Sequence, residues 1–354
     1  MAKKTYNLIG VMSGTSLDGV DIASVKISTK PQYTAEIVTA ITVPYTEEWE
    51  QKLKAGIHQS PEHLALLDED YTDYLGQCIS QFIDDNNIKN LDAVCSHGHT
   101  ILHQPEAGIT LQIGNLPKLA TAINQTVVCD FRTQDVTLGG QGAPLVPIGD
   151  QLLYSKYDYC LNLGGFANVS SEKNGNRLAY DICPVNVVLN IYAQRLGEPY
   201  DTGGAFAKAG TINPELLKQL NALPFYAKSA PKSLGMEWVH SHILPLLEDA
   251  DSNSMDILAT FTEHVAIQLA NQFKEGSKVL VTGGGAFNGY LLERVAFHKD
   301  LNIVLPDSKL IEFKEALIFA LLGLLKLEGA INCLSSVTGA RKDHSSGMVY
   351  YPNR

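Results

Sequence analysis

The stretch GVMSGTSLDGVD, residues 10–21, decides how the chain is to be read. It joins the apolar runs Leu8–Met12 and Val20–Ile27, which predict the two strands of a hairpin. A plain hairpin needs only two turn residues, such as the Asp18-Gly19 pair present here. The segment adds a further glycine and three hydroxyl side chains, namely Gly14, Ser13, Thr15 and Ser16. Because glycine lets backbone N–H groups approach a ligand closely, this hairpin is a candidate anion-binding loop.

Composition predicts a cytoplasmic enzyme with two domains. The chain has 354 residues, 45% hydrophobic and 18% charged, with a formal net charge of −11. That charge disfavours nucleic acid or an anionic membrane as a partner, and the longest apolar run, 316–325, is too short to span a membrane. The six cysteines lack a C-x-x-C spacing, so we interpret them as buried thiols in a reducing compartment, rather than as disulfides or a zinc site.

Outward from the hairpin, a pattern of strands and helices occurs twice. We expect strands over 6–12, 20–28 and 34–43, then a helix opened by Ser60-Pro61-Glu62 and short strands over 91–95 and 127–129. After the segment LGGQGAPLVP (138–147), strands are expected over 159–163, 166–170 and 177–182, with a helix after Pro184 and a strand over 278–281. This alternation predicts an α/β fold with mixed sheets, and its recurrence indicates two related domains.

Three glycine-rich turns follow expected strands and favour a nucleotide held between two domains. They are Gly14–Gly19, Gly164-Gly165 and Gly283–Gly285. The chain contains no G-x-x-x-x-G-K-[ST], so it is not a P-loop protein. The run GGGAFNG from Gly283 disfavours a dinucleotide fold, and residues 10–14 miss the nucleophile elbow of hydrolases by one position.

Two aspartates are candidates for chemistry. Asp181 ends an expected strand before Pro184, where a carboxylate suits a general base, although a helix N-cap is the commoner role of such a residue. Asp18 suits Mg²⁺ held through water beside phosphates, and its alternative role is that of a turn residue.

Arg132, His97, His99 and Glu315 have weaker signals. Arg132 directly follows a strand and suits a bidentate grip on a carboxylate, with a surface ion pair as its alternative. His97 and His99 form an H-x-H pair with no evident third metal ligand, which favours hydrogen bonding or a structural role. Glu315 opens an apolar helical run, where an acid is commonly a helix-start charge.

Together these motifs resemble the anhydro-N-acetylmuramic acid kinase family. The resemblance covers nearly the whole chain in order and rests on GVMSGTSLDGVD (10–21), the H-G-x-T of 97–100, LQIG (111–114), DFR (130–132), LGGQGAPLVP (138–147), LNLGGFANVS (161–170), APKS (230–233), TGGGAFN (282–288), EALIFA (315–320) and SVTGA (336–340). It implies the fold of actin, sugar kinases and heat-shock-chaperone ATPases. Two ribonuclease-H-like domains would span residues 1–134 plus 335–354 and residues 135–334, with an ATP cleft between them.

The resemblance also implies a reaction and roles for named residues. The family is a phosphotransferase that uses ATP and Mg²⁺ to open 1,6-anhydro-N-acetylmuramic acid with water and phosphorylate O6, in peptidoglycan recycling. The catalytic aspartate falls on Asp181. The ATP-binding positions would be Gly14, Thr15, Ser16, Leu17, Asp18, Gly19, Val20, Asp21, Gly164, Gly165, Asn168, Gly283, Gly284, Gly285 and Asn288. The sugar-binding positions would be Ser13, Thr100, Asp130, Arg132 and Glu315, with Arg132 on the lactyl carboxylate.

The sequence departs from the family at the catalytic motif. D-T-G-P-G-N in the family is Asp181-Ile182-Cys183-Pro184-Val185-Asn186 here, so Val185 is expected to add bulk near the sugar or the phosphates. His99 stands where the family usually has Gln. Two alternatives therefore stay open: a kinase or phosphatase of the same fold acting on another sugar or on polyphosphate, and an ATP-binding paralogue without catalysis. Family members are often homodimers, which makes a homodimer one expectation for this chain.

Overall fold

The computed structural model describes residues 5–14 and 17–353 and divides into two compact units. Residues 1–154 and 313–354 belong to the first unit, and residues 155–312 form the second. Residues 135–154 and 313–334, which the sequence analysis placed in the second domain, therefore lie in the first compact unit. The division falls inside helix α13 (Ser308–Leu327), at Phe313, whose dihedral angles (φ −109°, ψ 17°) are not helical.

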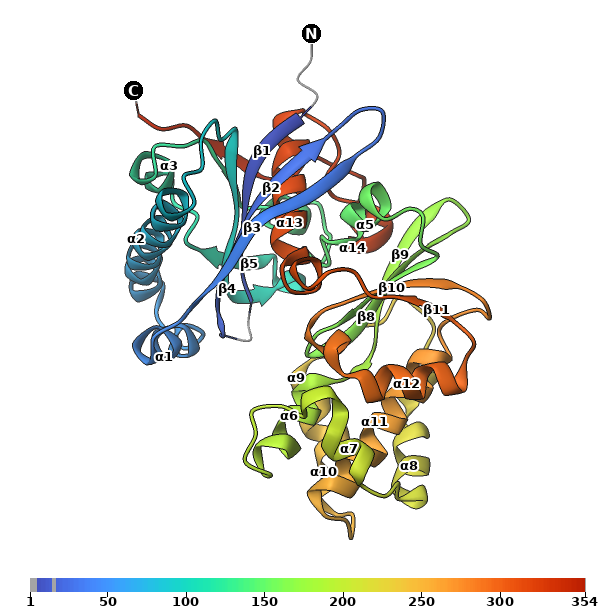
Figure 1. Cartoon of the computed structure of the whole chain (residues 1–354). Coiled ribbons are helices and arrows are strands. Elements are labelled where there is room, and N and C mark those ends of the chain that lie inside the picture. Colours follow the sequence, from blue (N-terminus) through green and yellow to red (C-terminus); the bar gives the residue numbers. More distant parts are fainter. Residues whose placement is uncertain (1–4, 15–16, 354) are drawn as a thin grey trace. The chain divides into compact units, whose positions relative to one another are not determined.

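The first unit is built on one mixed sheet (Figure 1). Its strand order is β12-β6-β4-β1-β2-β3, and β5 also pairs with β4. Strands β1, β4 and β6 are parallel neighbours, whereas β1, β2 and β3 form an antiparallel meander. Besides α13, the elements of this unit are β1 (Thr5–Ser13), β2 (Gly19–Ser28), β3 (Thr34–Pro44), α1 (Glu47–Gly56), α2 (Pro61–Asp85), β4 (Ala93–Gln104), η1 (Pro105–Ala107), β5 (Ile109–Ile113), α3 (Lys118–Ala122), β6 (Val127–Cys129), α4 (Thr133–Thr137), α5 (Pro147–Leu153), α14 (Ser335–Thr338) and β12 (Met348–Tyr350).

Helices cover both faces of this sheet, with α2 along one face and α13 across the other (Figure 1). On the α2 face, Ile9 and Val11 of β1 pack in one core with Tyr71 and Leu75 of α2. Gly10 points to the opposite face because side chains alternate along a strand. A Cβ atom on Gly10 would lie 1.8 Å from the carbonyl oxygen of Ala316, so the glycine permits α13 to lie directly on β1.

The second unit repeats the same strand order. Its sheet runs β11-β10-β7-β8-β9, with β7, β8 and β9 antiparallel and β7, β10 and β11 parallel. This matches β6-β4-β1-β2-β3 strand for strand, which confirms the expected pair of related α/β units. The elements are β7 (Tyr159–Leu163), β8 (Phe166–Lys173), β9 (Asn176–Pro184), α6 (Asn186–Gln194), η2 (Thr202–Gly204), α7 (Ala205–Ala209), α8 (Pro214–Asn221), η3 (Pro224–Ala227), α9 (Met236–Trp238), η4 (Val239–Ile243), α10 (Leu244–Glu248), α11 (Ser254–Ala270), β10 (Lys278–Thr282), η5 (Gly284–Phe287), α12 (Gly289–His298) and β11 (Asn302–Val304).

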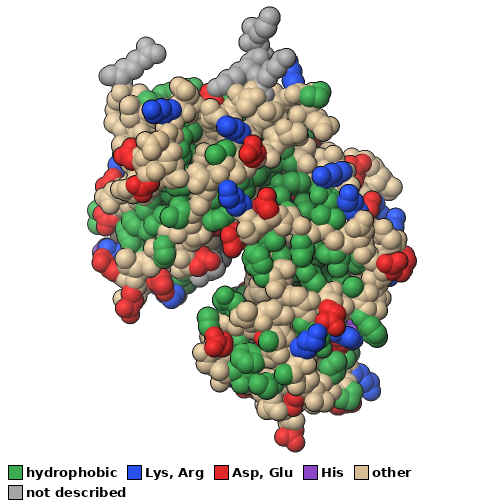
Figure 2. Space-filling view, in the orientation of Figure 1, with side chains coloured by type: hydrophobic (Ala, Val, Ile, Leu, Met, Phe, Trp, Pro, Cys, Tyr) green, Lys and Arg blue, Asp and Glu red, His purple; other side chains and the backbone are tan. Residues whose placement is uncertain are grey.

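The surface and the thiols agree with the composition. Acidic and basic side chains are interspersed on the face shown in Figure 2. All six cysteines are free, and five of them are buried. None of the helices described is long and apolar enough to cross a membrane.

Candidate functional site

In the first unit, the expected sugar-binding residues gather at the carboxyl ends of three parallel strands. Ser13 ends β1, Thr100 lies in the outer part of β4, and Asp130 and Arg132 follow β6. Because β1, β4 and β6 are adjacent and parallel, these ends meet at one edge of the sheet, which is where ligands bind in open α/β sheets.

A bulge in β4 aims the H-x-H motif at this edge. The β1–β4 register passes from Val11↔Ser96 to Ser13↔His99, so β4 holds one extra residue. Gly98 lies there with φ +73°, and a Cβ on it would lie 2.3 Å from the Ile113 carbonyl oxygen. His99 Nδ1 lies 2.8 Å from the Ser13 hydroxyl oxygen, and burial lowers the pKa of His99 to about 4. His99 is therefore a neutral hydrogen-bonding group at neutral pH.

His97 holds Arg132 in place, a contact that the sequence analysis did not anticipate. Burial lowers the pKa of His97 well below its usual value, so the ring is neutral. Its Nδ1 lies 2.9 Å from the Gly98 carbonyl oxygen, which assigns the proton to Nδ1 and leaves Nε2 to accept from Arg132 Nε at 2.9 Å. Arg132 Nη1 donates to the Gly142 carbonyl oxygen at 2.6 Å. The only available signal was that H-x-H and DFR follow neighbouring strands.

Arg132 stays cationic and keeps donors for a ligand. Desolvation lowers its pKa from 12.5 to about 10, and the Glu315 carboxylate opposes this shift. Among the contacts described, its Nη2 donates no hydrogen bond, so that side of the guanidinium is available to an acid.

Glu315 sits where α13 crosses β1. Its neighbour Ala316 packs on Gly10, which fixes this turn of the helix against the strand. Its side chain keeps solvent access, yet it lies deep enough among protein atoms for desolvation to raise the pKa of the carboxyl. Arg132 and Lys314 act in the opposite direction. Glu315 and Arg132 therefore interact electrostatically at the same edge.

Thr100 and Asp130 take part in local hydrogen bonds. The Thr100 hydroxyl oxygen accepts from Gln112 Nε2 at 3.4 Å, across the β4–β5 pair. Asp130 adopts a left-handed conformation with φ +56° and accepts from the Thr133 N–H at 3.4 Å. This turn carries the chain from β6 to Arg132.

The β1–β2 hairpin carries the first glycine-rich turn. Thr15 and Ser16 lie outside the described residues. Leu17 has φ +61°, and Asp18 is exposed. Gly19 has φ +155°, and a Cβ on it would lie 2.4 Å from the Val43 carbonyl oxygen.

The last two residues of that motif belong to the sheet. The Val20 side chain is fully buried in the core. Asp21 Oδ1 accepts from the Thr42 hydroxyl at 2.6 Å. Any contact of Val20 with a ligand would therefore come through its backbone.

In the second unit, the other two glycine turns lie side by side. Strands β7 and β10 are parallel, with Asn162 opposite Thr282, and each ends in one of the turns. Gly283 has φ +82°, and a Cβ on it would lie 2.6 Å from Asn162 Oδ1. A Cβ on Gly285 would lie 2.8 Å from the Leu163 Cβ, whereas one on Gly284 would meet no atom within 4 Å. Gly283 and Gly285 therefore allow the turns to pack, and Gly284 borders open space.

The Gly164-Gly165 turn is tied to the start of α6. The carbonyl oxygen of Gly165 accepts from the Val185 N–H at 2.8 Å, and that of Gly164 accepts from the Asn186 N–H at 3.4 Å. The peptide carbonyls of the turn thus satisfy orphan amides of the helix N-terminus.

Asp181 completes a row of polar side chains on this sheet. In the register, Asn162 of β7 faces Asn168 of β8, which faces Asp181 of β9. Directly opposed residues project from the same face. The next pair toward the strand end is Ala167↔Cys183, which leaves Ile182 as an extra residue in β9. Such a bulge re-aims neighbouring side chains and is common beside active sites.

The Asp181 carboxyl has the environment of a base. It is half-buried, and desolvation raises its pKa, while the Leu234 N–H, donating to Oδ2 at 2.8 Å, acts in the opposite direction. The Asp181 N–H donates to the Lys232 carbonyl oxygen at 3.0 Å. The A-P-K-S segment therefore packs beside the aspartate and holds it.

The structure changes the interpretation of the altered motif. Ile182, Cys183 and Val185 are each fully buried in the core of the second unit. Val185 therefore fills the core, and the expected bulk near a ligand is not seen.

Asn288 has a structural task. Its Oδ1 accepts from the Leu291 N–H at 3.0 Å and caps α12, and the side chain is buried. Of the residues expected at the adenosine, Gly284 is the one bordering open space.

Known proteins similar to this chain share one name. A family model described as "Anhydro-N-acetylmuramic acid kinase" matches residues 6–352. The proteins of that name from Pseudomonas syringae pv. tomato and Pseudomonas putida are 34% and 36% identical over 370 residues, covering 97% of this chain and 98% of each relative. That from Vibrio cholerae is 34% identical over 368 residues, covering 98% of both chains. Among solved structures, the Acidaminococcus fermentans (R)-2-hydroxyglutaryl-CoA dehydratase component A has a TM-score of 0.47 and 14% identity over 91% of this chain and 99% of its own.

Proposed function

The chain belongs to the anhydro-N-acetylmuramic acid kinase family, and from this premise we propose that it couples hydrolytic opening of 1,6-anhydro-N-acetylmuramic acid to phosphorylation of its O6 by ATP. The product is N-acetylmuramic acid 6-phosphate, and the reaction serves peptidoglycan recycling. The observation that carries the proposal is the position of Asp181, which is held at a bulge in line with Asn168 and Asn162, two strands from the Gly283 turn.

Asp181 is the general base. Its carboxylate takes a proton from a water molecule that attacks C1, through a transition state of oxocarbenium character. The C1–O6 bond breaks, O6 takes the γ-phosphoryl group of ATP, and ADP leaves. The raised pKa of Asp181 makes it a stronger base than an exposed aspartate, which supports this role.

The glycine turns hold ATP in this proposal. Backbone N–H groups of Gly14–Gly19 and Gly164-Gly165 surround the phosphates, and the Gly283–Gly285 turn lies against the adenosine. Mg²⁺ supplies positive charge against the phosphate oxygens when it is bound. Asp18 suits it because its carboxylate is exposed in the β1–β2 hairpin, where it would hold the ion through water.

The sheet edge of the first unit holds the sugar. Arg132, already oriented by His97, binds the lactyl carboxylate through its remaining donors. Ser13, Thr100, Asp130 and Glu315 contact sugar hydroxyls or the reacting water. We place the protein in the cytoplasm and expect a homodimer, as is frequent in the family.

Sugar-dependent release of ADP tests this proposal. The full chain with Mg-ATP is expected to release ADP only when 1,6-anhydro-N-acetylmuramic acid is present. Asp181→Asn should abolish the sugar-dependent part while Asp251→Asn, an exposed aspartate in the same unit, should not. Full activity of Asp181→Asn would refute the assignment. Release with another sugar or with polyphosphate alone would favour a different kinase, and ATP binding without any release would favour a non-catalytic paralogue.

A further inference from the structure

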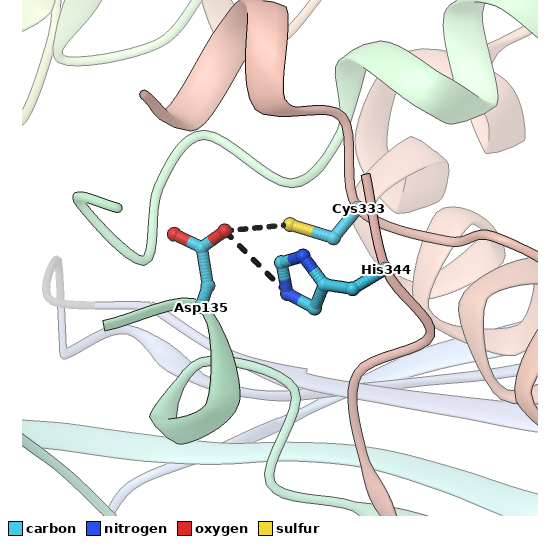
Figure 3. Close-up of side chains that lie close together, drawn as sticks. All are labelled: Asp135, Cys333 and His344. Atoms are coloured by element: carbon cyan, nitrogen blue, oxygen red, sulfur yellow. Dashed lines mark hydrogen bonds and ion pairs between the residues drawn. The ribbon is translucent and has the colours of Figure 1, made fainter. Parts of the chain in front are cut away.

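Three buried side chains that the proposed reaction does not use converge in the first unit. They are Asp135 of α4, Cys333 and His344, and Figure 3 shows all three pointing toward one another. Their exposed fractions are 0%, 1% and 5%. They stand far apart in the sequence, which is why cysteine spacing indicated no metal site.

The backbone presents Cys333 and His344 as a pair. The two residues form an isolated antiparallel bridge, in which the Cys333 N–H donates to the His344 carbonyl oxygen at 3.1 Å and the reverse bond measures 3.2 Å. Residues paired in this way project their side chains from the same face. The thiol and the imidazole therefore reach Asp135 together.

The distances suit a small tetrahedral ion. Asp135 Oδ1 lies 3.1 Å from Cys333 Sγ and 3.5 Å from His344 Nε2, and the three ligand atoms all lie within 4.8 Å of one another. Ligands at Zn²⁺ bond lengths in a tetrahedral arrangement would be about 3.3–3.6 Å apart. Small shifts of the side chains would thus admit the ion.

The imidazole shows that a cation is needed here. His344 Nδ1 lies 3.1 Å from the Lys342 carbonyl oxygen, which assigns a proton to Nδ1. Nε2 has no hydrogen-bond partner although it is buried. In the neutral ring its lone pair faces a carboxylate oxygen, and two acceptors in contact require a cation between them. Metal-bound histidines commonly donate the other ring N–H to a carbonyl in this manner.

Further contacts orient the carboxylate. Oδ2 accepts from the Gly142 N–H at 2.7 Å, and Oδ1 accepts from the Thr338 hydroxyl at 2.7 Å. A Cβ on Gly140 would lie 2.2 Å from Oδ2, so the surrounding loop closes tightly over the acid. Asp135 is thus held with Oδ1 directed at the thiol and the imidazole.

We propose that Asp135, Cys333 and His344 bind a structural Zn²⁺ ion. The mixed sulfur, nitrogen and oxygen donors select Zn²⁺ over Mg²⁺ or Ca²⁺, which prefer oxygen alone. On binding, the Cys333 thiol gives its proton to solvent and its sulfur bonds the metal. The ion ties the segment of residues 333–344 to α4, which begins directly after Arg132. This site is separate from the proposed transfer of phosphate.

Metal titration of the tag-free, reduced full-length chain tests the proposal. After treatment with a chelator and dialysis, the protein should take up one equivalent of Zn²⁺ in competition with a chromogenic chelator. Cys333→Ser and His344→Ala should each lower the affinity by at least about 100-fold. The matched controls Cys78→Ser and His58→Ala, outside the cluster, should bind as the parent protein does.

Cobalt spectroscopy keeps the test decisive if a variant fails to fold. Co²⁺ added to the unaltered metal-free chain should give a thiolate-to-cobalt absorption band and the intense visible bands of tetrahedral coordination, and Zn²⁺ should remove both. Uptake of no zinc, or cobalt spectra without the thiolate band, would overturn the proposal. A protonated His344 would then be the cation facing Asp135.

Discussion

Arg132 donates from Nε to Nε2 of His97 across 2.9 Å, so that the guanidinium expected to bind the substrate carboxylate is fixed by a neutral imidazole from the neighbouring strand. Both residues follow parallel strands, β4 and β6, whose ends meet at one edge of the sheet. A positively charged binding group is thereby oriented without being neutralised by its partner.

Removing His97 should weaken sugar binding more than it slows the reaction. In His97→Ala the guanidinium loses a hydrogen bond worth about 1.5–3 kcal/mol for a charged donor, so the KM for the anhydro sugar should rise by roughly 10- to 100-fold. Steady-state kinetics with the sugar varied should show this change while the KM for ATP stays within about twofold. His58→Ala, exposed in the same unit, is the matched control. Equal losses for sugar and ATP would indicate general damage instead.

His99 should make the fold sensitive to acid. Its pKa is about 4 when folded against 6.5 for an ordinary histidine, so the unfolded chain binds the proton first as the pH falls. Stability should therefore decrease between pH 7.5 and pH 5, by about 2 kcal/mol for this residue. In urea unfolding, His99→Gln should lose less stability over that range than the parent protein. Identical pH dependence in the two proteins would contradict the burial argument.

Restoring the family glycine at position 185 should harm the fold and leave substrate binding unchanged. Val185→Gly removes a fully buried side chain and adds backbone freedom, which together cost about 2–4 kcal/mol of unfolding free energy. Thermal unfolding should report the loss, and the KM for the sugar should stay the same at a temperature where the variant is folded. A markedly lower KM would show that Val185 does obstruct the site.

The sequence predicted the regular elements well where hydrophobic patterns are strong. The strands expected over 127–129 and 159–163 have those bounds, and the second unit repeats the first as anticipated. The strand expected over 91–95 was too short, because β4 continues to Gln104 through polar residues. Those residues are stabilised by pairing with β5 and by the bulge at Gly98, which no hydrophobic period indicates.

Side-chain constellations were harder to anticipate than strands. Asp181 was identified as a candidate base, but its bulge and its contact with Leu234 depend on a segment more than fifty residues away. Val185 was expected near a ligand because burial cannot be read from a motif. The cluster of Asp135, Cys333 and His344 joins residues from distant parts of the chain, so its spacing carried no signal.

The fate of one water oxygen tests the central claim most directly. The full chain is incubated with Mg-ATP and 1,6-anhydro-N-acetylmuramic acid in oxygen-18 water, and the product is examined by mass spectrometry with fragmentation, beside Asp181→Asn. Since Asp181 activates water for attack on C1, the early product should be a 6-phosphorylated sugar with one heavy oxygen at C1 and none in the phosphate. Asp181→Asn should form it about 10²–10⁴-fold more slowly. Heavy oxygen in the phosphate, or ADP formed without labelled sugar, would contradict the account.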